Sequence, residues 1–256
     1  MNYKIKQATV IFAILLMIAI NILANALPIN GLNTGEISDQ FEVYFVPAGY
    51  VFSIWGVNYI GLIAYAIFLV LPAQQKNSRL QTTGWWVVLG SLANSVWIFL
   101  WHYGQFIGTL GAMLILLASL IKIYLHLGIG RIQVSRGEAL AVHLPFSIYL
   151  GWITVATVAN VTDVLDYVGW NRFGLSQEVW MVITLGVVLG IALLMNFTRR
   201  DIAYSAVLLW ALAGIAIKFP SSGIVTTSTW ITFVLIALSL PLAYLTSKEK
   251  GLREKK

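Results

Sequence analysis

Tryptophan and asparagine residues recur at helical spacing in three apolar stretches of the sequence. Trp55 lies within FVPAGYVFSIWGVNY, Asn94 and Trp97 lie within NSVWIFLWH, and Trp152 and Asn160 lie within PFSIYLGWITVATVAN. An indole ring presents a large flat face for stacking, and an amide presents both donors and acceptors of hydrogen bonds. Residues of these types could wall a site for a planar ligand, with the amides as polar anchors, or they could be core packing or membrane-interface anchors.

The spacing in each stretch places these residues on one face of a helix. Positions three, four, seven or eleven residues apart return to nearly the same face. The three stripes are Pro47, Phe52, Trp55 and Tyr59; Asn94, Trp97 and Trp101; and Pro145, Tyr149, Trp152, Ala156 and Asn160. Because a buried amide that faces lipid is costly, the asparagines should face the interior of a helix bundle or a cavity.

Depth in a membrane separates three of these tryptophans from interface anchors. At about 1.5 Å per residue, Trp55 and Trp152 lie roughly 12–13 Å below the outer ends of their helices, and Trp97 lies about 9 Å below. Anchoring tryptophans lie at the lipid headgroups instead. That shallower position fits four others: Trp85, Trp86, Trp170 and Trp180.

Core packing is the main alternative for the three stripes. Aromatic stripes often fill the space between helices, and asparagines can hydrogen-bond one another from helix to helix. Asn21 and Asn25, on the first apolar segment, add two amides that could take part in such bonds. Spacing alone leaves both interpretations open.

Composition determines the class of protein. The chain has 256 residues, of which 59% are hydrophobic and only 10% are charged, whereas about 25% is usual for soluble domains. Such a sequence predicts an integral membrane protein. The chain has no cysteine, which excludes disulfides, thiolate nucleophiles and cysteine-bound metals.

Hydrophobic segments divide the chain into about eight expected transmembrane helices. They cover residues 8–26, 47–72, 85–103, 106–127, 138–161, 178–197, 201–218 and 226–246. No alternating strand pattern occurs in the sequence, so we expect an all-α polytopic bundle and not a barrel. The first segment has features of a signal peptide, but its apolar run is long for one, and we expect a retained helix.

The charges orient this bundle. If the N-terminus is cytoplasmic, fourteen of the sixteen Lys and Arg residues lie on the cytoplasmic side, and only Arg172 and Lys218 lie outside. The positive-inside rule therefore predicts a multi-pass protein with both termini in the cytoplasm, and we expect the cytoplasmic membrane of a bacterium. The basic tail at 247–256 is interpreted as an orientation signal in contact with lipid and not as a nucleic-acid patch.

Other chemistry is sparse in the sequence. The three histidines fall on different segments and predict no metal site. Nearly every acid is expected in a loop, including Asp163 and Asp166 in the loop at 162–177, so no pair of buried carboxylates suggests a proton relay. The pattern Gly186-x-x-x-Gly190 indicates close helix packing, of which a homodimer contact is one form.

The motifs resemble those of the tryptophan-rich sensory protein / translocator protein family (TspO/MBR, the peripheral-type benzodiazepine receptor family). That family carries W-x-P-x-x-x-V-F followed by a Trp and a Tyr one turn apart, N-x-x-W on its third helix, and W-x-x-x-A-x-x-x-N on its fifth. The matching residues here are Phe45 in place of the first Trp, Pro47, Val51, Phe52, Trp55, Tyr59, Asn94, Trp97, Trp152, Ala156 and Asn160.

The resemblance implies a five-helix unit over residues 1–165 whose pocket is closed by the first loop. It says nothing about the rest of the chain, in which the sequence supplies additional transmembrane helices at 166–246 and a basic tail at 247–256. The resemblance also implies a porphyrin, haem-like or other tetrapyrrole ligand, with no required cofactor. Stripes and motifs together give twelve candidate ligand-binding residues: Phe45, Pro47, Phe52, Trp55, Tyr59, Asn94, Trp97, Trp101, Tyr149, Trp152, Ala156 and Asn160.

Three functions of different classes follow from the sequence. The favoured one is a membrane receptor or carrier that binds a planar hydrophobic ligand, tetrapyrrole-like or lipid-like, in a sensory or transport role. The second is a secondary transporter of small amphipathic compounds, against which stands the expected lack of an intramembrane acid. The third is an intramembrane enzyme acting on pigment or lipid. No nucleophile–base or metal constellation supports that last function, so we expect no enzyme.

Overall fold

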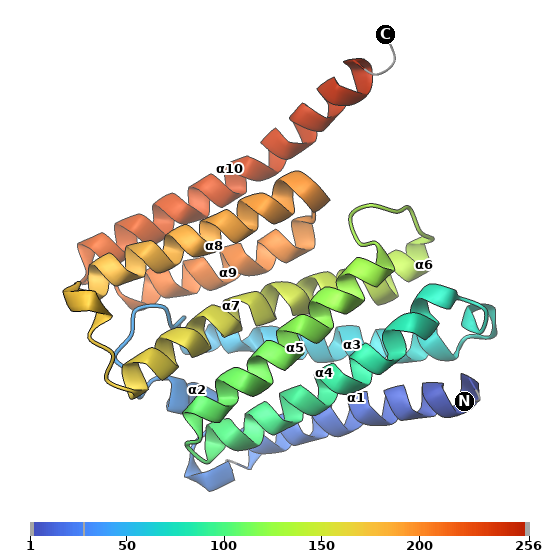
Figure 1. Ribbon diagram of the computed structural model, residues 1–256, viewed down its shortest axis with the longest axis horizontal. Helices are drawn as coiled ribbons and strands as arrows, with labels where there is room; N and C mark the ends of the chain where they lie inside the picture. Colours follow the sequence, from blue (N-terminus) through green and yellow to red (C-terminus); the bar gives the residue numbers. More distant parts are fainter. Residues whose placement is uncertain (1–2, 28, 254–256) are drawn as a thin grey trace.

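The computed structural model describes residues 3–27 and 29–253 as helices joined by short connections (Figure 1). No strand occurs among these residues, which confirms the predicted all-α fold. The long helices are α1 (Tyr3–Ala26), α3 (Ile54–Val70), α4 (Ser78–His102), α5 (Phe106–Leu127), α7 (Leu144–Tyr167), α8 (Gln177–Arg199), α9 (Ile202–Lys218) and α10 (Gly223–Arg253). The short elements that matter below are α2 (Thr34–Ser38), the 3₁₀ turn η2 (Gly49–Ser53), α6 (Arg136–Glu138) and the π-turn η4 (Ala139–His143).

Seven of the described helical stretches are long and apolar enough to cross a membrane. The eighth predicted segment is α9, which has 17 residues and lies at the lower limit of about 17–25 residues for a spanning helix. The structure therefore has seven candidate spans and one shorter apolar helix where about eight spans were predicted. Large apolar side chains such as Ile60 and Leu194 point outward from the bundle, as expected for a surface that contacts lipid.

The helices form two groups that lie side by side. Helices α1, α3, α4, α5 and α7 make one bundle, and α8, α9 and α10 make a layer beside it, with α9 packed on α7 (Figure 1). Gly151 of α7 permits this contact, because a Cβ there would lie 2.9 Å from the carbonyl oxygen of Tyr204. The start of α1 and the end of α10 lie at the same end of the molecule (Figure 1).

Several helix boundaries differ from the predicted segments, and the structure shows what sets two of them. Helix α7 continues to Tyr167 instead of ending near residue 161, because the first strong stop signal is Gly169, at φ +68°. Helix α4 begins at Ser78 instead of residue 85, since the Asn77 side chain accepts the Leu80 N–H and caps the helix at 3.5 Å. Hydropathy locates apolar spans, whereas these polar first and last turns depend on caps.

The predicted basic tail lies largely beyond the described side chains. The backbone of α10 is described to Arg253, side chains are described to Thr246, and residues 254–256 lie outside the described chain. Orientation across the membrane therefore stays a prediction from the charges.

Candidate functional site

A small cavity lies between α4, α5, α7 and the segment that leads from α2 into α3. Its volume is about 40 Å³, and its lining residues are Thr34, Ser38, Pro47, Phe52, Trp55, Trp97, Trp101, Met113, Trp152, Val155, Ala156, Ala159, Asn160 and Asp163. Eight of the twelve predicted site residues are in this set: Pro47, Phe52, Trp55, Trp97, Trp101, Trp152, Ala156 and Asn160. The helical spacing of each stripe thus brings residues from three helices to one place.

Aromatic rings make up most of the wall. Trp97 and Trp101 stack at a centroid separation of 5.1 Å and an interplanar angle of 18°. Trp152 meets the ring edges of Trp55 at 6.1 Å and Phe52 at 5.8 Å. Trp97, Trp101 and Trp152 are buried, whereas Phe52 and Trp55 are half-buried. The wall therefore has a fixed side, on α4 and α7, and a side nearer the surface, on η2 and α3.

A larger open groove lies on the other side of Phe52 and Trp55. It has a volume of about 730 Å³ and is lined by Asn21, Ile22, Asn25, Ala26, Asn33, Thr34, Gly35, Glu36, Asp39, Gly49, Phe52, Trp55 and Tyr59. The groove contains the predicted residue Tyr59. Groove and cavity share Thr34, Phe52 and Trp55, so these three side chains form the partition between the two spaces.

The first loop covers the cavity through α2. Asn33 caps α2 and forms a capping box with Glu36. The loop is fastened to α4 because Trp101 Nε1 donates to the Thr34 carbonyl at 3.1 Å. His102 adds two contacts, from Nε2 to the Thr34 hydroxyl at 3.2 Å and from Nδ1 to the Ile29 carbonyl at 3.0 Å. Thr34 and Ser38 are thereby held over the aromatic wall.

The predicted asparagines have different positions. Asn160 lines the cavity, accepts the Trp97 Nε1–H at 3.2 Å and donates to Thr109 Oγ1 at 2.9 Å. Asn94 does not line the cavity: it accepts from Asn21 Nδ2 at 2.7 Å and donates to the Tyr149 hydroxyl at 3.2 Å. Asn94 and Tyr149 therefore belong to a buried network that joins α1, α4 and α7.

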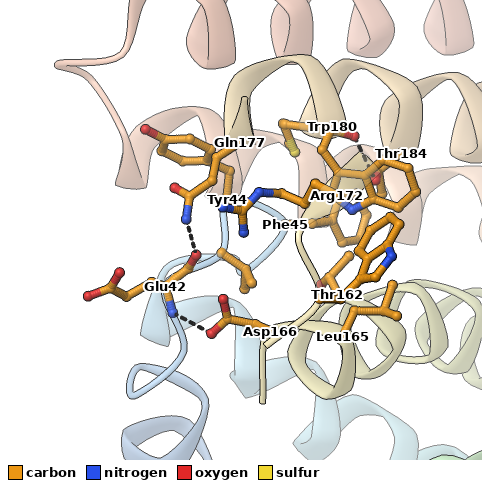
Figure 2. A pocket seen from close by; sticks show the side chains of 13 residues that line it. Glu42, Tyr44, Phe45, Thr162, Leu165, Asp166, Arg172, Gln177, Trp180 and Thr184 are labelled. Carbon is orange, nitrogen blue, oxygen red and sulfur yellow. Dashed lines mark hydrogen bonds between the residues drawn. The ribbon is translucent and has the colours of Figure 1, made fainter. Parts of the chain in front are cut away.

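Phe45, the remaining predicted residue, lies in a different pocket (Figure 2). This second pocket, of about 30 Å³, lies between the first loop, the end of α7 and the start of α8. Glu42 N–H donates to Asp166 Oδ2 at 3.3 Å, and Gln177 Nε2 donates to the Glu42 carbonyl at 2.9 Å (Figure 2). Arg172 also lines this pocket. Phe45 contributes to packing between the loop and α8, away from the Trp-lined cavity.

Two polar atoms of the cavity lining are buried without a hydrogen-bond partner in the described part of the chain: Asp163 Oδ1 and Trp152 Nε1. Asp163 is only 2% exposed. The expectation that Asp163 lies in a loop is wrong, because α7 extends one further turn and a half and carries this carboxyl into the bundle. Extending the stripe Trp152, Ala156, Asn160 by three residues would have found it.

Another acid, Asp201, is buried away from the cavity, in the connection between α8 and α9. Asp201 accepts from the Tyr124 hydroxyl at 2.8 Å and the Ser147 hydroxyl at 2.6 Å, and it caps α9. These bonds join α5, α7 and α9, so the Asp201 carboxylate is satisfied. No group of three or more potential metal ligands occurs among the residues whose side chains the structure describes.

The C-terminal layer supports the site from outside through α9. None of the described residues that line the cavity or the groove belongs to α8, α9 or α10. Helix α9 nevertheless holds η2, because Trp210 Nε1 donates to the Val51 carbonyl at 3.2 Å and the Ala48 N–H donates to the Gly214 carbonyl at 3.3 Å. An ion pair between Lys218 and Asp39 adds a further link to the first loop.

The sequence model of the TSPO-like protein family matches residues 7–242. The match runs past residue 165, where the resemblance of the motifs ended, and takes in α8, α9 and most of α10. No curated protein and no solved structure matches the chain. With its apolar helices and a family match over most of its length, the chain is an integral multi-pass membrane protein that belongs to the TSPO-like protein family.

Proposed function

We propose that this protein is a membrane receptor or carrier that binds a planar hydrophobic ligand between the Trp-lined cavity and the adjoining groove. The observation that carries the proposal is the partition: Phe52 and Trp55 line both spaces. A flat ligand lying in the groove would meet these rings first. Trp97, Trp101 and Trp152 would then form the inner wall of its site.

Binding requires movement of the partition. The cavity of about 40 Å³ has room for a few water molecules, far less than a planar organic ligand occupies. The groove of about 730 Å³ is large enough for such a ligand. Because Phe52 and Trp55 are half-buried and the inner tryptophans are buried, rotation of the two outer rings is the simplest way to join the spaces.

The ligand class follows from the walls and from the family. Stacking on indoles favours a conjugated, flat molecule, and resemblance to the family favours a tetrapyrrole, with lipid-like molecules as the alternative. Bound in this way, the ligand would be sensed or carried without chemical change. If the cavity opened toward the groove, the ligand would have a route into the site between α1 and α3.

A secondary transporter of small amphipathic compounds is the second candidate. The observation that favours it is Asp163, a carboxyl inside a candidate span, where the sequence had indicated that no such acid was present. Ionisable residues within spans often lie on substrate or ion pathways. Uptake of a bound ligand into proteoliposomes would distinguish transport from binding alone.

The test of binding is a titration of the purified protein with protoporphyrin IX and with 9-methylanthracene, a small planar hydrocarbon. We expect at least one of them to quench tryptophan fluorescence saturably. The same titration of Trp152→Ala should show weaker binding, and Trp85→Ala, whose ring is half exposed, should bind like the wild type. The proposal would be contradicted if neither compound, nor a charged planar compound of similar size, bound saturably.

A further inference from the structure

Asp163 is the one carboxyl side chain among the described residues lining the Trp cavity. It follows Asn160 by three residues and so continues the same face of α7. The side chain is 2% exposed, and its Oδ1 atom has no hydrogen-bond partner in the described chain. A buried carboxylate in this state is costly unless a positive charge or a donor is supplied, and a cationic ligand in the cavity that Asp163 lines would supply that charge.

The charged residues around Asp163 do not supply a free positive charge to pair with its carboxylate. Lys218 acts on Asp163 electrostatically, but it forms an ion pair with Asp39. Asp166, one turn further along α7, also acts on Asp163 and carries the same sign of charge. No lysine or arginine occurs among the described residues that line the cavity or the groove. The excess of charge along this route is therefore negative.

The groove that leads from the cavity toward the surface is also lined by negatively charged residues. Glu36 and Asp39 lie along it, next to the amides of Asn21, Asn25 and Asn33. A cation that enters the groove would be attracted along its length, and an anion would be repelled. Asp39 is partly neutralised by Lys218, which leaves Glu36 at the mouth and Asp163 at the inner end.

The aromatic wall suits a cation as well. Trp55, Trp97, Trp101 and Trp152 line the cavity with Asp163, and indole is the strongest aromatic partner for a cation held over its face. Aromatic cages of this kind recognise quaternary ammonium groups. A carboxyl at one end of such a cage adds direct charge pairing.

We propose that the site selects a planar aromatic cation, whose charge pairs with Asp163 while its rings lie against the tryptophans. This inference rests on the proposed function, since it specifies the charge of the ligand in the same site. It leads to an order of affinity: cation first, neutral isostere second, anion last. For a ligand that also carries acidic groups, those groups should remain at the mouth of the groove, away from Asp163.

Three probes with the same three-ring skeleton test this order. They are 10-methylacridinium, a fixed cation; 9-methylanthracene, its neutral isostere; and anthracene-9-carboxylate, an anion. Titration of the intact protein in detergent should give tighter binding of the cation than of the hydrocarbon by about tenfold, and weaker binding of the anion than of either. The charge of 10-methylacridinium does not change with pH, so all three probes can be compared at a single pH.

Asp163→Asn removes the charge with almost no change in shape. We expect this variant to lose the preference for 10-methylacridinium and to bind 9-methylanthracene like the wild type. Asp166→Asn is the matched control: it removes the same charge one turn away on the same helix, from a side chain that lines the second pocket. For each variant, the affinity for 10-methylacridinium is divided by the affinity for 9-methylanthracene. Comparing this ratio between variants cancels the different partitioning of the two probes into detergent.

The outcomes separate the two proposals. If none of the three probes binds the wild type saturably, and protoporphyrin IX also fails, the proposed function is wrong and the inference falls with it. If the hydrocarbon binds but the cation binds no more tightly, or if the preference survives in Asp163→Asn, only the inference is wrong. Should Asp163→Asn fail to fold, the order of the three probes on the unaltered protein still decides the question.

Discussion

The Trp97 indole N–H donates a hydrogen bond to Asn160 Oδ1 at 3.2 Å and thereby joins α4 to α7 beside the cavity. The same amide donates to Thr109 Oγ1 of α5 at 2.9 Å. Asn160 is therefore both a lining residue and the point at which three helices meet. Its two roles can be separated by experiment.

Asn160→Leu should lower the stability of the fold. The change leaves the buried Trp97 N–H without its acceptor and removes the donor to Thr109 Oγ1, and hydrogen bonds between membrane helices contribute about 0.6–2 kcal/mol each. Thermal unfolding in detergent should show a lower midpoint than for the wild type. Trp97→Phe removes the bond to Asn160 but keeps an aromatic ring in place and leaves the bond from Asn160 to Thr109, so it should have a smaller effect. A Trp97→Phe protein as stable as the wild type would mean that the Trp97–Asn160 bond is not the source of the loss.

Asn94→Leu should reduce stability without reducing intrinsic ligand affinity. Asn94 bonds to Asn21 and Tyr149 and does not line the cavity. A double-mutant cycle of Asn21→Leu and Asn94→Leu should give a coupling energy of about 0.6–2 kcal/mol, since either change alone breaks the same bond. A folded Asn94→Leu protein that binds the planar probe much more weakly would instead make Asn94 a ligand anchor.

Trp152→Ala should weaken binding of the planar ligand. The residue is buried at the back of the cavity and contacts both partition rings, and loss of a well-packed aromatic anchor costs about 1–3 kcal/mol of binding free energy. Trp85→Ala and Trp180→Ala, which lie outside the cavity lining, are the controls and should change affinity little. Equal effects of all three changes, measured by fluorescence titration, would contradict the assignment of the cavity as the site.

The stripes could be predicted from the sequence because they depend on local periodicity. Trp97 and Trp152 repeat with the helix, and hydropathy shows that their helices cross the membrane. Periodicity gives the face of a helix but not the neighbour that covers it. Asn94 was therefore expected in the cavity although Asn21 of α1 covers it, and Phe45, which was carried over from the family motif, lies in the second pocket.

Three lining residues, Asp163, Thr34 and Ser38, were missed because their positions depend on where helices begin and end, which periodicity alone does not give. Asp163 was missed because the end of α7 is set by Gly169 and by burial against neighbouring elements, whereas a polar residue after an apolar run resembles a loop. Thr34 and Ser38 were missed because α2 is too short to show periodicity. The pattern Asn33-x-x-Glu36 is a capping box and would have predicted a helix there.

His102→Ala should loosen the first loop. His102 contacts Thr34 and Ile29 and so fastens α2 over the cavity. With these contacts removed, ligand association and dissociation should both become faster, because the cover opens more often. Stopped-flow fluorescence would measure both rates. Unchanged rates in a folded variant would show that the Trp101 bond to the Thr34 carbonyl holds the loop by itself.

Gly214→Ala should weaken ligand binding although Gly214 does not line the site. A Cβ at this position of α9 would overlap Val51 Cγ2 and would lie 3.4 Å from Pro47 Cβ. Val51 is fully buried and β-branched, so it cannot rotate away easily, and η2 must shift. Because η2 leads directly into α3 and contains Phe52, the shift should reach the partition between groove and cavity.

Gly186→Ala is the matched control for this change. It also replaces a helical glycine by alanine in the C-terminal layer, but a Cβ at Gly186 meets no atom within 4 Å. Alanine is favoured over glycine in a helix by about 1 kcal/mol, so Gly186→Ala should raise the unfolding midpoint or leave it unchanged and should bind ligand normally. Gly214→Ala should lower both stability and affinity. If Gly214→Ala binds ligand like Gly186→Ala, α9 merely packs beside the five-helix bundle and does not support the site. If only Gly214→Ala loses affinity, α9 is part of the binding unit. That second outcome would agree with the family match, which runs through α9.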